Sequence, residues 1–124
     1  MSLWFYDTYQ DETHFGLRVT KSLYHGRSEY QAIDIFETDL FGKVLALDGV
    51  FQTSVGDEYY YHEMLVHPAL TTAPRVRNVL VIGGGDGGTV REVLSYPEVE
   101  RVTMVEIDRM VVEASREYLP EIGK

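Results

Sequence analysis

A glycine-rich turn between a short apolar strand and a helix constrains this chain more than any other feature. The strand is expected over residues 79–82, and the turn follows as Gly83-Gly84-Gly85-Asp86-Gly87-Gly88. A second apolar stretch at 102–105 leads directly into Glu106. Doubly wound α/β proteins bind nucleosides in this way, because the glycines let the backbone approach the ligand and a carboxylate after the next strand binds the ribose. The pattern therefore predicts a parallel α/β sheet with a nucleoside site.

Asp86, inside that turn, limits which nucleoside can bind. Gly83, Gly85 and Gly88 match the dinucleotide spacing, which by itself would predict NAD. However, the pyrophosphate of a dinucleotide binds at the helix N-terminus, where a carboxylate would repel it. Two like charges about 4 Å apart cost about 4 kcal/mol at an effective dielectric constant of about 20. A sulfonium or ammonium group would be attracted instead, so the turn favours a cationic S-adenosyl compound.

Each carboxylate of this region also has a structural interpretation. Asp86 can hydrogen-bond its own turn or cap the following helix. Glu106 can remain in solvent or pair with Arg109. For Asp108 the helix cap is the first interpretation and ligand contact the second.

The first part of the chain, residues 1–55, is expected to be a small antiparallel β domain. Strands are predicted over 17–20, 33–36, 43–47 and 50–53. Asp48-Gly49 separates the last two, and this pair supplies the positive φ angles that a two-residue hairpin turn requires.

Residues 56–124 are expected to begin a Rossmann-like domain. Asp57 can cap a helix over 58–66, with Pro68 kinking or restarting it and a connector at 71–75. Two further helices are expected to present apolar faces at helical spacing. These faces are Val90, Val93 and Leu94 in the first helix, and Val111, Val112, Ser115, Tyr118 and Leu119 in the second.

The strand at 79–82 is apolar at every position, as expected when helices cover both faces of a sheet. In the common doubly wound order this strand is central, and its other neighbour comes from later in the chain. Because soluble proteins avoid an unpaired apolar edge, the chain is expected to be the front part of a larger domain or to be completed by a partner chain. The predicted fold class is thus α/β, a small β domain followed by the first βαβα units of a methyltransferase-like Rossmann fold.

The segment from Tyr59 to His67 contains two histidines and three tyrosines. A zinc-binding helix places its histidines at i and i+4, whereas His62 and His67 are five residues apart, roughly 140° around a helix. No metal site is therefore expected. Tyr61 and His62 keep two interpretations: part of an aromatic core face, or a pocket wall facing an amine or a nucleoside.

Composition restricts the partners. The net charge of -9 argues against nucleic acid or an anionic membrane. The chain contains no cysteine, which is compatible with a reducing compartment, and a cytoplasmic location is expected. No apolar stretch approaches the roughly 18 residues of a membrane span.

Five motifs in order resemble the spermidine synthases, the polyamine aminopropyltransferases. They are Leu47-Asp48-Gly49-Val50-Phe51-Gln52-Thr53, Asp57-Glu58, Tyr61-His62-Glu63-Met64, the glycine turn 83–88, and Glu106-Ile107-Asp108. The resemblance extends from about Leu3 to Pro120, and a generic methyltransferase would share only the last two motifs.

This resemblance implies aminopropyl transfer from decarboxylated S-adenosylmethionine to a diamine, normally putrescine, without a separate cofactor. Longer diamines and agmatine stay open as acceptors, and a homodimer or homotetramer is implied. The donor-nucleoside residues would be Gln31, Gln52, Gly83, Gly85 and Glu106, and the amine-side residues Tyr61, His62 and Asp86.

The resemblance also implies that the catalytic base is an aspartate beyond residue 124, so no catalytic residue is assigned here and the 124-residue chain alone is expected to be inactive. Two rival functions remain at this stage. One is a methyltransferase-like protein that uses S-adenosylmethionine itself. The other is a non-catalytic fragment that oligomerises through its β domain.

Overall fold

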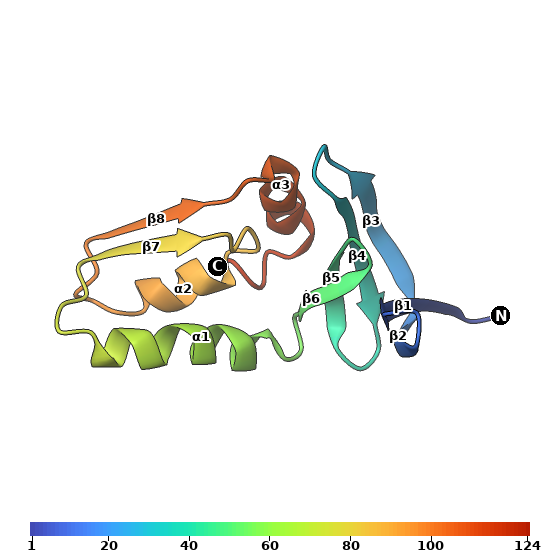
Figure 1. The fold of residues 1–124 in the computed structure, drawn as a ribbon, viewed down its shortest axis with the longest axis horizontal. Helices are drawn as coiled ribbons and strands as arrows, with labels where there is room; N and C mark the ends of the chain where they lie inside the picture. Colours follow the sequence, from blue (N-terminus) through green and yellow to red (C-terminus); the bar gives the residue numbers. More distant parts are fainter. The chain divides into compact units, whose positions relative to one another are not determined.

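A computed structural model describes all 124 residues, which divide into two compact units, Met1–Asp57 and Glu58–Lys124. Figure 1 shows the first unit in blue to green and the second in green to red. The first unit contains β1 (Leu3–Tyr9), β2 (Thr13–Val19), β3 (Lys21–Arg27), β4 (Ala32–Thr38), β5 (Gly42–Leu47) and β6 (Val50–Ser54). The second contains α1 (Glu58–Thr72), β7 (Asn78–Ile82), α2 (Gly88–Leu94), β8 (Arg101–Val105) and α3 (Arg109–Tyr118).

The first unit consists of an antiparallel sheet in the order β3-β4-β5-β6 and a β1–β2 hairpin. The hairpin packs on the sheet through aromatic rings, and the rings of Phe5 and Phe36 stack with centroids 4.8 Å apart. Phe36, Val44 and Ala46 form the buried centre of this core. Such a small unit gains much of its core area from phenylalanine, because each aromatic ring buries a large apolar surface.

The predicted hairpin at Asp48-Gly49 is confirmed. Both residues have positive φ, 49° and 79°, as a two-residue turn requires. Asp48 also accepts a hydrogen bond from the backbone N–H of Ala32 at 2.8 Å, which ties the turn to the start of β4. The strands predicted at 33–36, 43–47 and 50–53 lie within β4, β5 and β6, while the strand predicted at 17–20 is the end of a longer β2.

The helix expected over 58–66 is longer than expected, because α1 continues through Pro68 to Thr72. A restart at Pro68 is therefore wrong, and the connector expected at 71–75 begins only after Thr72. Proline removes one backbone donor, and the carbonyl that loses its partner belongs to Met64, four residues earlier. Met64 is 70% exposed, so water can replace the missing bond. The hydroxyl of Thr72 donates to the Pro68 carbonyl at 2.7 Å and supports the last turn.

In the second unit, β7 and β8 are parallel and α2 lies between this strand pair and α1 (Figure 1). The helix cap predicted for Asp108 is confirmed, since its side chain accepts from the backbone N–H of Met110 at 3.0 Å. The predicted α3 face is also confirmed, with Val111, Ser115 and Leu119 buried. No helix in the structure is long and apolar enough to cross a membrane.

Three apolar positions of this unit differ from the expectation. Leu94 was expected on the inner face of α2, but it is 62% exposed. The strand β7 is covered on one face only: Val81 is buried, while Leu80 and Ile82 are exposed at 60% and 85%. The other edge of β7 has no strand beside it, since β8 is its one neighbour.

Candidate ligand-binding site

The glycine turn connects β7 to α2 and lies at the carboxyl ends of β7 and β8. Gly83, Gly84 and Gly87 have φ between 77° and 86°, a region that side chains rarely adopt. The Gly83 N–H donates to the carbonyl of Val105 at 2.8 Å, so the turn begins hydrogen-bonded to the end of β8. At Gly85 a β-carbon would lie 3.0 Å from the Glu106 carboxylate, so this glycine lets the backbone approach the acid.

Glu106 is held in place by backbone donors. One carboxylate oxygen accepts from Gly85 N–H at 3.0 Å and the other accepts from Asp108 N–H at 3.1 Å. Because an ionised carboxylate offers about four acceptor positions, each oxygen can still accept from a ligand hydroxyl. Arg109, the possible partner of Glu106, pairs with Glu113 at 2.6 Å instead. The geometry therefore suits a carboxylate that is fixed in position to bind a diol.

Asp86 has both a structural contact and a free acceptor. Its Oδ1 accepts from Gly88 N–H at 2.8 Å and lies 3.3 Å from Nε2 of His62. The first contact is the turn bond that the structural interpretation anticipated. No group of the chain hydrogen-bonds Oδ2, so the second oxygen is available to a cationic ligand.

His62 is buried, with 1% of its side chain exposed, and a carboxylate faces each of its ring nitrogens. On the side away from Asp86, Nδ1 lies 2.5 Å from Glu58 Oε2. Arg91 donates hydrogen bonds to the same glutamate from two nitrogens, at 2.8 and 2.9 Å. Such a two-pronged pair fixes orientation as well as charge.

These contacts shift the pKa values of the four side chains. Burial works against ionisation of His62, but hydrogen bonds to Asp86 and Glu58 outweigh burial and raise its pKa. Burial likewise opposes ionisation of both acids. The pKa of Glu58 is nevertheless lowered by Arg91 and His62, and the pKa of Asp86 by His62 and the Gly88 N–H. Hydrogen bonding to Glu58 raises the pKa of Arg91. All four groups are therefore stabilised in their charged forms.

Gly88 is the position that makes room for His62. A β-carbon built there would lie 2.2 Å from Cε1 of the imidazole. Sequence spacing placed Gly88 in a nucleotide-binding pattern, whereas the structure shows a steric reason for it.

The other predicted residues lie around this centre or in the first unit. Tyr61 is 59% exposed, and its ring meets that of His62 edge-on at 5.1 Å between centroids. Gln31 is half-buried between β3 and β4. Gln52 is exposed on β6, where its amide donates to the carbonyl of Val50 at 3.2 Å.

A pocket of about 340 Å³ opens beside the glycine turn. Its lining includes Gly85 and Asp86 of the turn, apolar residues such as Val90 and Met104, and the basic residues Arg116 and Lys124. Neither Glu106 nor His62 lines this pocket. The fixed carboxylates define the candidate site better than this pocket does, because they carry the groups that can select a ligand.

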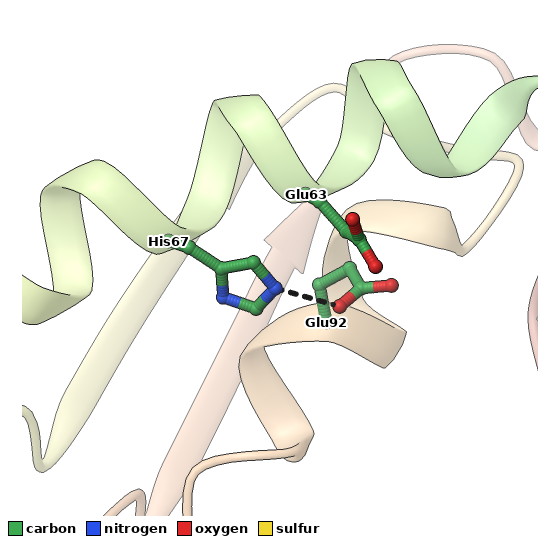
Figure 2. Close-up of side chains that lie close together, drawn as sticks. All are labelled: Glu63, His67 and Glu92. Atoms are coloured by element: carbon green, nitrogen blue, oxygen red, sulfur yellow. Dashed lines mark ion pairs between the residues drawn. The ribbon is translucent and has the colours of Figure 1, made fainter.

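A second cluster lies between α1 and α2. Figure 2 shows Glu63, His67 and Glu92, whose potential metal-ligating atoms lie within 4.8 Å of one another. The atoms of Glu92 are already used: one oxygen lies 3.1 Å from His67 and the other 2.8 Å from Arg91. Nδ1 of His67 is 2.7 Å from the hydroxyl of Tyr96. A cation would therefore have to displace existing pairs.

Sequence reasoning missed Glu58 and Arg91 as members of the site. Glu58 precedes His62 by four residues, the spacing at which side chains of a helix meet. That signal is present in the sequence. Arg91 carries no comparable signal, because its contact with Glu58 depends on how α2 packs against α1.

The fold and site of the second unit define a class: an α/β protein with a glycine turn after its first parallel strand, a carboxylate fixed by backbone N–H groups and a second acid beside the helix N-terminus. Two family models match the chain. The spermine/spermidine synthase domain matches residues 58–124, and the spermidine synthase tetramerisation domain matches residues 3–54.

Relatives and solved structures agree with this match. The chain is 47% identical over 119 residues to a polyamine aminopropyltransferase of Clostridioides difficile, covering 96% of this chain and 42% of the relative. It is 48% identical over 123 residues to that of Caldicellulosiruptor bescii, covering 99% and 44%. The crystal structure of spermidine synthase from Thermotoga maritima superposes with a TM-score of 0.94 at 43% identity, covering 97% of this chain and 42% of that one.

The chain belongs to the spermine/spermidine synthase family, as the resemblance of its motifs predicted. It spans somewhat more than two fifths of the length of these curated relatives.

Proposed function

We propose that this chain forms part of a protein that transfers an aminopropyl group from decarboxylated S-adenosylmethionine to a diamine, with putrescine as the favoured acceptor. The observation that carries the proposal is Asp86, an ionised acid in the glycine turn whose Oδ2 is available for a ligand cation. The names of the relatives, polyamine aminopropyltransferase and spermidine synthase, support it. A second structure of similar fold, at 43% identity, is that of a spermidine synthase in complex with the transition-state analogue AdoDATO.

The predicted residues would bind two different parts of the donor, its nucleoside and its aminopropyl arm. Glu106 would accept hydrogen bonds from the ribose hydroxyls, and the glycines at 83 and 85 would let the backbone approach the nucleoside. Gln31 and Gln52 would add contacts to the nucleoside. On the amine side, Tyr61, His62 and Asp86 would face the aminopropyl arm, with the Asp86 carboxylate pairing with its ammonium group.

The chemistry is a displacement at carbon. The neutral acceptor nitrogen attacks the propyl carbon next to the sulfonium; a carbon–nitrogen bond forms, the carbon–sulfur bond breaks, and sulfur takes the electron pair as a neutral thioether. The attacking nitrogen then loses a proton to a base. Because the sulfonium already activates the donor, the residues of this chain would contribute mainly by positioning.

No residue of this chain is assigned as the base, so we expect the isolated chain to be inactive. An acidic site concentrates diamines but favours their charged form. A general base must therefore deprotonate the attacking nitrogen, and no residue of this chain is assigned that role.

Assembly is also part of the proposal. The model that matches residues 3–54 carries the name tetramerisation domain, which supports an oligomer built through the first unit. Light scattering after size-exclusion chromatography would distinguish a homodimer from a homotetramer. The expected cytoplasmic location stays a prediction.

The test is an assay of the longer protein that carries this chain. Spermidine and methylthioadenosine should form from putrescine and decarboxylated S-adenosylmethionine, as measured by mass spectrometry. Asp86→Asn keeps the turn acceptor but removes the charge, so kcat/KM should fall at least about tenfold, equivalent to about 1.4 kcal/mol. Asp39→Asn, at an acid whose side chain is 70% exposed in the first unit, is the matched control and should be unchanged.

Two results would contradict the proposal. One is tighter binding of S-adenosylmethionine than of its decarboxylated form, which would favour the methyltransferase-like alternative. The other is clear turnover by the isolated 124-residue chain, which would show that the base lies within it.

A further inference from the structure

The buried imidazole of His62 lies between two acids that come from different elements. Glu58 belongs to α1, and Asp86 belongs to the loop before α2. The distances from the ring nitrogens are 2.5 Å to Glu58 and 3.3 Å to Asp86. Only 1% of the side chain is exposed, so the two acids rather than bulk water meet its ring nitrogens.

The hydrogen-bonding inventory fixes the form of this ring. An ionised carboxylate can only accept, and a neutral imidazole has one donor nitrogen and one acceptor nitrogen. With a carboxylate at each nitrogen, a neutral ring would direct a lone pair at one of them. The ring therefore matches both neighbours only when both nitrogens carry protons, that is, as an imidazolium.

Arg91 completes the set of charges around this ring. It binds Glu58 with two nitrogens and also donates to the backbone carbonyl of Ile122 at 2.7 Å, which anchors the guanidinium. The sequence Arg91, Glu58, His62 and Asp86 then alternates in sign and sums to zero. Gly88 also lies against the ring, and the ring of Tyr61 meets it edge-on.

We propose that Glu58 is a positioning residue for the aminopropyl transfer: it holds His62 as an imidazolium, and His62 in turn holds Oδ1 of Asp86 so that Oδ2 faces the donor's amine. This rests on the proposed function, because it assigns the amine to Asp86. Glu58 touches neither substrate, since it acts through the ring.

Loss of the proton from His62 would undo this arrangement. The 2.5 Å contact with Glu58 keeps the remaining proton on Nδ1, and Nε2 then presents a lone pair to Asp86. Asp86 would keep the Gly88 N–H but lose its second anchor. The amine would therefore meet an acid whose orientation is no longer fixed.

The first experiment needs no variant. Nitrogen-15 NMR of the ring in the longer protein reports whether each nitrogen carries a proton. At pH 6.5, the ordinary pKa of the residue, the His62 ring should be more than half imidazolium. A ring that is mostly neutral at this pH overturns the proposal.

The second experiment compares two identical substitutions on one helix. Glu58→Gln removes the charge beside His62, and Glu63→Gln is the control, because Glu63 stands four residues before His67 on the exposed side of α1. Calorimetry should measure binding of decarboxylated S-adenosylmethionine to the longer protein at pH 8 and pH 6. At pH 8, E58Q should bind at least about tenfold more weakly than the wild type, because loss of the neighbouring negative charge lowers the pKa of His62 and leaves Asp86 without its second anchor. At pH 6 the difference should shrink, because His62 regains its proton.

The outcomes separate the two proposals. If the wild type does not bind the donor at all, the proposed function fails. If the wild type binds and E58Q matches it at both pH values, the positioning role is wrong. A defect in E58Q that is equal at pH 6 and pH 8 also overturns the role, since damage to the fold would not be rescued by protonation of one histidine.

Discussion

Replacement of Gly88 by alanine should destabilise the second unit, although alanine is the better helix former. The added β-carbon would lie 2.2 Å from Cε1 and 2.5 Å from each nitrogen of His62. Carbon atoms in favourable contact are about 3.5–4 Å apart. The ring therefore has to move, and it cannot do so without leaving Glu58 or Asp86, the acids that hold its two nitrogens.

The magnitude follows from two opposing effects. Breaking a buried charge pair costs about 3–5 kcal/mol. Alanine in place of glycine within a helix returns about 1 kcal/mol, which leaves a net loss of about 2–4 kcal/mol. For a unit of this size each kcal/mol lowers Tm by roughly 4–8 °C, so the expected fall is on the order of 10–30 °C.

Far-ultraviolet circular dichroism is a suitable assay, because all three helices belong to the second unit and the signal reports on its unfolding. A double-mutant cycle supplies the control. In a His62→Ala background the space around Gly88 is open, and Gly88→Ala should be neutral or slightly stabilising. Equal destabilisation in both backgrounds would refute the steric argument, as would an unchanged Tm for the single variant.

Three further predictions concern neighbouring residues. Asp108→Ala should lower the free energy of unfolding by at least about 1 kcal/mol in urea, through loss of the cap on Met110 N–H, and Asp108→Asn should retain most of it. Stability should be highest between pH 4.5 and 6.5, the ordinary pKa values of glutamate and histidine. The acids, whose pKa values are lowered in the fold, lose their contribution as pH falls below this range. His62, whose pKa is raised, loses its contribution as pH rises from 6.5 through the raised pKa. A His62→Gln variant should flatten the alkaline side of that profile, as followed by thermal unfolding. Glu106→Gln should weaken adenosine binding about tenfold in calorimetry, because the amide replaces one acceptor oxygen with a donor while the Gly85 N–H still needs an acceptor.

The parts of the fold that sequence predicted were those with strong local signals. The turn at Asp48-Gly49 requires positive φ at both residues, and few sequences supply it. The cap by Asp108 and the apolar face of α3 are likewise local patterns. Pro68 misled the prediction, because a missing backbone donor is tolerated where the carbonyl of Met64 can reach water.

The strands β1 and β3 were not predicted, and the reason is in their side chains. Both have mainly exposed or half-buried positions, so they lack a clean alternation of buried apolar and exposed polar residues. Each is held by the strand that follows it, β1 by β2 and β3 by β4. Cross-strand contacts of this kind override weak local preference.

Sequence reasoning named candidate site residues whose own side chains carry the expected chemistry. It missed residues that belong to the site only through a contact with another side chain. Asp86 and Glu106 follow from their position after parallel strands, and both lie at that end of the sheet. Their hydrogen-bond partners are backbone N–H groups and His62, and sequence spacing does not predict these partners. Glu58 was within reach of sequence reasoning through its i, i+4 spacing to His62, but Arg91 required the packing of α1 against α2.

A buried set of charges is weak evidence for stability, because desolvation can exceed the attraction that is gained, and well-packed apolar replacements are often as stable. Stability alone therefore does not explain why Glu58, His62 and Arg91 stand together around Asp86. Unlike apolar side chains, the charged groups fix the orientation of their neighbours. Each acid is held at one oxygen or both by a donor of known position. For Asp86 this leaves a single oxygen without a partner, beside the turn where the ligand's cation is expected. The network is thus better understood as a device that orients one carboxylate than as a source of folding energy, and variants that keep Tm but lose donor affinity are the ones that would show it.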